Sequence, residues 1–167
     1  QLITDNSPRA CRADGDRMTH MGLIDSHAHL TFPDLRDQVD DVLARAREAG
    51  VDHIITIATT PVDGDSAVAI ARQHPGVVSA AVGLHPHHAK EATDADVDQV
   101  RRWMDDPDVI ALGEMGLDYF YDFCPKQQQQ RIFAGQLAFA VACDLPVIIH
   151  SRKAFDETEA MLIEHGM

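Results

Sequence analysis

Two histidines separated by a single residue give the sequence its clearest chemical signal. His27 and His29 lie in the segment 25–30 (DSHAHL), which directly follows the apolar pair 23–24. Residues i and i+2 of an extended strand point to the same face, so the two imidazoles can bind one metal ion together. Asp25 has the same parity and is placed to orient a ligand. The alternative is a polar turn that carries two ordinary surface histidines.

Two other apolar runs are followed by side chains that can also bind a divalent metal ion. Glu114 follows the run 109–113 (VIALG), and a glutamate at the end of a strand can bridge two divalent ions. His150 ends the run 146–149 (PVII), and Arg152 is placed to grip an anionic oxygen through its guanidinium group. Each of these residues alone fits a surface acid, a core histidine or a salt-bridge partner. Together with the first pair, they favour one shared metal site.

A histidine-rich loop, 84–88 (LHPHH), follows another apolar run, 77–83. His85 is the first histidine after the run, so it is the best candidate in this loop for a role in the site. Solvent exposure explains it equally well. For His87 and His88 we favour the exposed interpretation.

Five short apolar runs predict the elements that must position these residues. They are rich in Val and Ile and continuous rather than alternating, which is typical of a parallel sheet covered on both faces. Segments of helical period lie between them, most clearly from Leu35 to Ala49, where Gly50 is expected to end the helix. The strands are predicted near residues 23–24, 54–58, 77–83, 109–113 and 147–149.

This order predicts an α/β fold built from about five βα units. We expect residues 1–20 to form a flexible N-terminal extension and residues 21–167 to form the folded part. Periodicity does not distinguish an open doubly wound sheet from part of a closed barrel. A complete eight-stranded barrel takes about 250 residues, and this chain stops where a sixth strand would begin. We therefore expect that its ends are not both natural.

The net charge of the chain indicates how it could bind a nucleic acid or a phosphate. Its 167 residues include 14 Lys and Arg against 27 Asp and Glu, which gives a net charge of −13. Such an excess of acid argues against a groove that binds nucleic acid through basic side chains alone. A phosphate substrate remains compatible with it when metal ions supply the positive charge.

The sequence does not support several other classes of protein. Three cysteines without CxxC spacing argue against a disulfide framework and a thiolate zinc site, and they predict a reducing, cytoplasmic location. No run approaches the roughly 18 apolar residues of a membrane-spanning helix. The glycine-rich nucleotide-binding motifs and the GxSxG motif of serine hydrolases are absent.

Four ordered blocks of the chain resemble the TatD-type metal-dependent deoxyribonucleases, a family of amidohydrolase-like metal hydrolases. The blocks are 24–30, 83–86, 113–119 and 146–152. Gln130, Phe133 and Gln136 match the helix between the last two blocks as well. The likeness runs from about residue 22 to the end of the chain.

The resemblance implies a TIM (β/α)8 barrel, of which residues 21–167 would be the N-terminal portion. It also implies divalent metal ions, two of them, with Mg, Mn and Zn as the candidates. His27 and His29 would bind the first ion, Glu114 would bridge the two and serve as the catalytic carboxylate, and His150 would bind the second. The family's later His and Asp ligands match no residue here, which implies truncation at the C-terminus.

The activity implied is hydrolysis of the phosphodiester bonds of DNA, exonucleolytic on single strands, with His85 and Arg152 as predicted substrate contacts. One alternative is a metal-dependent amidohydrolase or esterase acting on a small molecule, because the wider superfamily shares the HxH pair. No lysine is clearly placed at the fourth strand, where many such enzymes hold a carbamylated lysine, and this favours DNA. A second alternative is an inactive truncated fragment.

Overall fold

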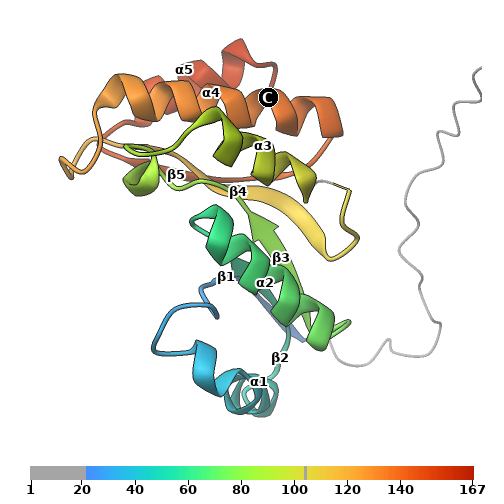
Figure 1. The fold of residues 1–167 in the computed structure, drawn as a ribbon. Helices are drawn as coiled ribbons and strands as arrows, with labels where there is room; N and C mark the ends of the chain where they lie inside the picture. The colour runs from blue at the N-terminus through green and yellow to red at the C-terminus, as the bar shows by residue number, and fades with distance from the viewer. Residues whose placement is uncertain (1–21, 104) are drawn as a thin grey trace, which may run out of the picture.

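A single parallel sheet organises the part of the chain that the computed structural model describes, residues 22–103 and 105–167 (Figure 1). The predicted extension 1–20 lies outside these residues. Within them, five strands pair in the order β1-β2-β3-β4-β5, and every pair is parallel. This confirms the prediction of repeated βα units. The strands are β1 (Leu23–Ala28), β2 (Val51–Ile57), β3 (Val78–Val82), β4 (Val109–Asp118) and β5 (Val147–Arg152).

The helices lie along the outer side of the curled sheet (Figure 1). Local sequence explains where several begin and end. Thr60 accepts a hydrogen bond from the Asp63 backbone N–H at 3.2 Å at the start of α2, and Gly50 adopts a φ of 87° just after α1. The helical elements are η1 (Arg36–Gln38), α1 (Val39–Glu48), α2 (Pro61–Gln73), η2 (Pro86–His88), α3 (Asp94–Arg102), α4 (Lys126–Cys143) and α5 (Phe155–Glu164).

Apolar side chains occupy both faces of the sheet. The largest cluster joins strand residues to residues of α2 and α4, with Phe133 and Leu137 fully buried at its centre. The smallest of the three clusters contains strand residues only, namely Ile57, Ala81 and Ala111, so it forms the inner face of the curl. Continuous apolar runs in the sequence therefore reflect a sheet that buries both of its faces.

Strands β4 and β5 are longer than the sequence predicted. We expected Glu114 to follow the fourth strand, but β4 continues through it to Asp118, and β5 continues past His150 to Arg152. The two strands pair along this extension, where Gly116 lies opposite His150 and Asp118 lies opposite Arg152. Because these glycines and polar residues have low strand propensity, only the pairing with the neighbouring strand makes them extended.

The edge strand β1 is more exposed than the centre of the sheet. Leu23 and Ile24 of β1 are each 64% exposed, whereas Ala80, Ala81 and Val82 of β3 are fully buried. No element among the described residues covers these two side chains on the open side of β1, so they stay exposed.

Two buried glutamines of α4 fix the carboxyl ends of the central strands. The Gln136 side chain accepts a hydrogen bond from the Leu84 N–H at 2.8 Å and donates one to the Leu84 carbonyl at 3.1 Å. Gln129 accepts from the Asp118 N–H at 2.7 Å and donates to the Asp118 carbonyl at 2.8 Å. Each side chain satisfies backbone groups beyond or at the end of a strand, where no neighbouring strand does so.

We expect Gln136→Leu to lower the free energy of unfolding by about 2 kcal/mol, because it leaves the Leu84 N–H and carbonyl without partners in the interior. The matched control is Gln127→Leu, an exposed glutamine of the same helix. Urea unfolding followed by circular dichroism measures both. Equal midpoints for the two variants would contradict this role.

Candidate metal centre

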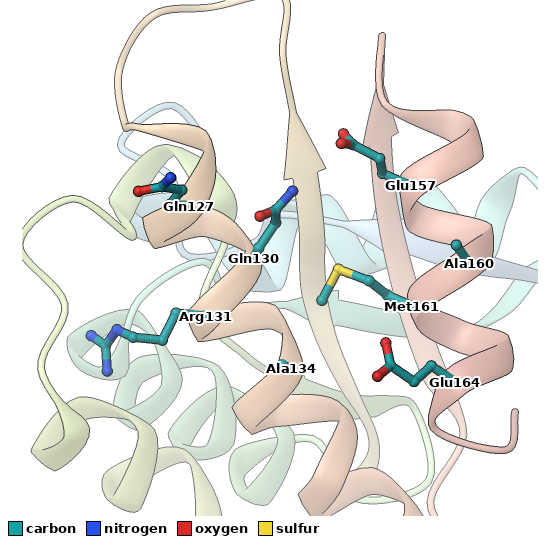
Figure 2. A pocket seen from close by; sticks show the side chains of 8 residues that line it. All are labelled: Gln127, Gln130, Arg131, Ala134, Glu157, Ala160, Met161 and Glu164. Carbon is teal, nitrogen blue, oxygen red and sulfur yellow. The ribbon is translucent and has the colours of Figure 1, made fainter.

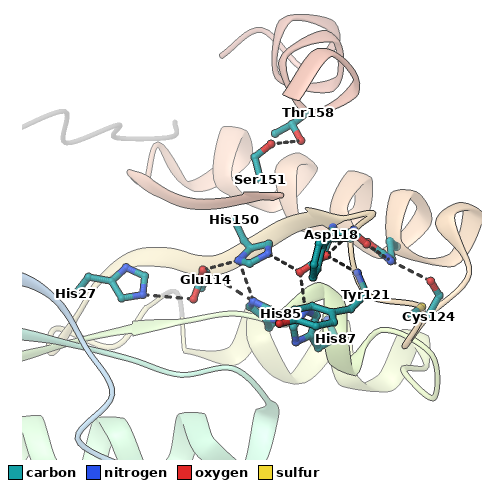
Figure 3. Close-up of polar contacts among 12 residues, drawn as sticks. His27, His85, His87, Glu114, Asp118, Tyr121, Cys124, His150, Ser151 and Thr158 are labelled. Atoms are coloured by element: carbon teal, nitrogen blue, oxygen red, sulfur yellow. Dashed lines mark hydrogen bonds and ion pairs between the residues drawn. The ribbon is translucent and has the colours of Figure 1, made fainter. Parts of the chain in front are cut away.

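The carboxyl ends of the strands bring together the four residues predicted to bind metal. His27 lies in β1 and His29 directly after it, Glu114 lies in β4, and His150 lies in β5. Figure 3 shows His27, Glu114 and His150 joined in one line of contacts. Residues that are up to 123 positions apart in the chain therefore meet because all parallel strands end at the same edge.

The first group of potential ligands consists of His27, His29 and Glu114. Glu114 Oε2 lies 3.3 Å from His27 Nε2 and 3.9 Å from His29 Nε2. His29 Nδ1 lies 3.0 Å from the Ile57 carbonyl, to which it can only donate. This hydrogen bond places the proton of neutral His29 on Nδ1 and leaves Nε2 with a lone pair directed at the site.

His150 lies between two carboxylates. Its Nδ1 is 2.9 Å from Glu114 Oε1, and its Nε2 is 3.1 Å from Asp118 Oδ2. The hydrogen bond with Glu114, followed by the one with Asp118, raises the pKa of His150 against the effect of burial. A histidine that donates one N–H to a buried carboxylate presents its other nitrogen in a fixed direction, as metal-binding histidines do.

Asp118 is fully buried and connects the site to the loop that follows β4. Its Oδ2 accepts from His87 Nε2 at 2.6 Å, and its Oδ1 accepts from the backbone N–H groups of Phe120 and Tyr121 at 2.9 and 3.1 Å. Burial opposes ionisation, but the hydrogen bonds from His87 and the two backbone groups outweigh it and lower the pKa of Asp118 to about 2.

The sequence interpretation gave Asp118 no role. Its spacing from Glu114 was the available signal. In a strand that extends to residue 118, as β4 does, residues 114, 116 and 118 point to the same face.

His85 and His87 also reach this edge of the sheet. His85 is buried, its Nδ1 accepts from the His87 backbone N–H at 3.1 Å, and its Nε2 lies 3.9 Å from Glu114 Oε1. Burial, followed by repulsion from His150, lowers the pKa of His85 to about 3. Neutral His85 therefore carries its proton on Nε2, which lies 3.1 Å from His150 Nδ1 and can donate to it.

Of the two histidines expected to be exposed, only His88 is exposed. His87 is half-buried, because Asp118 binds its ring.

Arg152 lies at the end of β5, where its guanidinium carbon is 4.3 Å from the centre of the Phe120 ring and 4.7 Å from that of Tyr121. Its guanidinium group therefore covers rings of the loop after β4, whose backbone Asp118 holds. A separate hollow of about 430 Å³ lies between α4 and α5 (Figure 2). Its side chains are Gln127, Gln130, Arg131, Ala134, Glu157, Ala160, Met161 and Glu164, which form none of the possible metal-binding groups found in the described residues.

The donor atoms of this edge suit divalent metal ions. The ligand atoms of His27, His29 and Glu114 lie within 4.8 Å of one another, and so do those of His85, His87 and His150. Imidazole nitrogens and carboxylate oxygens are the usual ligands of Zn²⁺ and Mn²⁺. The two oxygens of Glu114 face different groups, since Oε2 faces His27 and Oε1 faces His150.

The chain also matches the family model described as "TatD related DNase" over residues 24–166. It therefore belongs to this family. A relative from Erwinia tasmaniensis, called "3'-5' ssDNA/RNA exonuclease TatD", is 36% identical over 140 residues, which are 84% of this chain and 54% of the relative. A protein of Bacillus subtilis, called "Uncharacterized metal-dependent hydrolase YabD", is 33% identical over 144 residues, 86% of this chain and 56% of that protein.

The crystal structure of YJJV, a TatD homologue from Escherichia coli K12, superimposes with a TM-score of 0.81 at 35% identity. The match covers 86% of this chain and 56% of that one. This confirms the predicted fold class, a TIM-barrel family fold of which five βα units are present in the described residues. The chain spans about half the length of the curated relatives that it matches. Within the described residues, no helix has the length and apolar character needed to cross a membrane.

Two glycines of β4 allow its close approach to β5. Gly113 and Gly116 have φ values of 146° and 144°, and a Cβ atom on Gly116 would stand 2.0 Å from the His150 carbonyl oxygen. A side chain here would push β5 away, and L-residues rarely adopt this φ.

We expect Gly116→Ala to lower the free energy of unfolding by about 3 kcal/mol, because the new methyl group meets backbone that cannot move aside. Gly135→Ala in α4 is the control, since its Cβ would meet Val97 at an ordinary 3.6 Å and alanine favours the helix. Chemical denaturation measures both changes. A Gly116→Ala protein as stable as the wild type would contradict the close packing.

We expect divalent metal to stabilise the protein through Glu114. Metal at a concentration 100 times its dissociation constant should add about 2.7 kcal/mol to the free energy of unfolding. Glu114→Ala should lose most of this effect, whereas Glu164→Ala, an exposed acid of α5, should keep it. Thermal melts with and without Mn²⁺, together with calorimetric titration, measure the effect. An unchanged response in Glu114→Ala would count against the site.

Proposed function

We propose that this protein is a metal-dependent nuclease that hydrolyses the phosphodiester bonds of DNA, removing nucleotides from single strands. The observation that carries the proposal is the position of Glu114 between two groups of histidines, with one carboxylate oxygen toward each. The name of the Erwinia tasmaniensis relative, which describes an exonuclease of single-stranded DNA and RNA, supports the substrate class.

In this proposal the chain's own residues hold two divalent ions. His27 and His29 would hold one, His150 would hold the other, and Glu114 would be shared between them. Its hydrogen bond with His150 lowers the pKa of Glu114 although burial opposes this, so the carboxylate is ready as an anion. Bound ions of this kind offset the negative charge of a phosphate and make water a better nucleophile at neutral pH.

The surrounding side chains position these ligands and the substrate. Asp118 holds the His150 ring through Nε2, which leaves Nδ1 directed toward Glu114. His85 Nε2 lies 3.1 Å from His150 Nδ1. Once His150 Nδ1 holds an ion, the Nε2–H of neutral His85 would be free to donate to a phosphate oxygen beside Glu114. Arg152, which lies over the Phe120 ring, adds a positive charge near the site. This charge matters because the chain as a whole is acidic.

The test is release of nucleotides from an end-labelled single-stranded oligonucleotide in Mg²⁺ or Mn²⁺. We expect Glu114→Gln to reduce the rate about 100-fold or more, because it removes the charge shared by both ion sites. Asp118→Asn should reduce it about 10- to 100-fold, because His150 loses the partner that orients it. Glu164→Gln is the control.

Undiminished release by Glu114→Gln, or release that persists with chelator, would refute the proposal. Hydrolysis of small amides or esters without any action on DNA would instead identify a small-molecule hydrolase.

A further inference from the structure

Three aromatic side chains stand exposed in the loop that follows β4. Phe120 is 54% exposed, Tyr121 38% and Phe123 53%. The large exposed side chains of β1 belong to an open sheet edge, but this loop is not part of the sheet. A cluster of exposed rings on one short segment is typical of a binding surface. We call Phe120, Tyr121 and Phe123 the aromatic ledge.

The ledge is held in place by the residue that orders the metal centre. Asp118 binds the backbone N–H groups of Phe120 and Tyr121. The Tyr121 and Phe123 rings are stacked, with centres 5.0 Å apart and planes at 15°. Rings fixed in this way bind a flat partner without first losing side-chain freedom.

The ledge begins next to the histidines of the site. The His87 ring contacts those of Tyr121 and Phe123, with centres 5.4 and 4.8 Å apart, and Figure 3 shows Tyr121 beside His87 and Asp118. His87 and His150 share Asp118 as their partner, and His150 contacts Glu114. A ligand held at Glu114 therefore has the ledge as its immediate neighbour on this side.

The charged groups around the ledge suit a strand with anionic linkages. The Arg152 guanidinium lies over Phe120 and Tyr121. On the other side, a hollow of about 240 Å³ opens beside Phe123, lined by His87, His88, Lys90 and Glu91. Arg152 and Lys90 thus supply cations near the rings. The acids beside them are Glu91 in the lining of the hollow and Asp122, an exposed residue of the loop itself.

From this arrangement we infer that the aromatic ledge is a stacking site for a base of single-stranded nucleic acid, next to the phosphate bound at the metal centre. The inference rests on the proposed function. Aromatic rings beside a cationic track bind unpaired bases in a way that tolerates any sequence, because every base offers a flat face. A paired base in a duplex has its faces covered by its neighbours, so the ledge selects single strands.

The experiment compares two ligands that differ only in their bases. Calorimetric titration in Mn²⁺ measures binding of a thymidine pentanucleotide and of a pentamer of abasic sugars, both with phosphorothioate linkages that slow hydrolysis. We expect the wild type to bind the pentanucleotide about tenfold more tightly, which is the usual effect of one stacked base. This comparison requires no variant to fold.

A double variant assigns the difference to the ledge. Phe120→Leu with Phe123→Leu keeps apolar side chains but removes two rings, so it should lose most of the tenfold preference and bind the abasic pentamer as the wild type does. Phe155→Leu is the matched control, because Phe155 is also exposed and has no ring or cation contact among the described residues.

The outcomes separate the two proposals. Equal binding of both pentamers by the wild type, or a preference that survives in the double variant, overturns the ledge and leaves the nuclease proposal standing. A double variant that loses affinity for both pentamers alike also overturns it, because the rings would then support the site rather than a base. Binding of neither pentamer overturns the nuclease proposal and the ledge with it.

Discussion

Glu114 must remain ionised while it is buried among histidines, and the rest of the site depends on this. Desolvation disfavours its charge, but the hydrogen bond with His150 and the nearby His85 and His27 lower its pKa. Without a negative charge at this point, His27 on one side and His150 on the other would have no common partner. The carboxylate therefore joins the two halves of the site before any metal ion is considered.

The backbone is arranged to bring that carboxylate close to β5. Gly113 and Gly116 remove the side chains that would keep the two strands apart. On the outer side, α4 holds the same region, because Gln129 satisfies the backbone of Asp118 at the end of β4. Asp118 in turn orients His150 and His87. A short segment of β4 thus serves both as strand and as support for the site.

The sequence predicted the strands and the candidate metal ligands, because their signals are local. The five apolar runs became five parallel strands, and His27, His29, Glu114 and His150 met because chain position relative to a strand end determines where a side chain lies. The extension of β4 was missed, because its glycines are typical of a loop and only the pairing with β5 makes them a strand. The half-buried state of His87 was missed for a similar reason, because its partner lies 31 residues away.

An acidic protein that acts on a polyanion needs sources of affinity other than net positive charge. With a net charge of −13, this chain gains little from releasing the counterions of nucleic acid, a process that requires many basic contacts. Metal ions at Glu114 would act on one phosphate only. The proposed stacking on the aromatic ledge is independent of charge, so it would supply affinity that the acidic surface does not oppose. Together the two proposals predict a preference for a short single-stranded end, which brings one phosphate and one unpaired base to the site together, over the middle of a duplex.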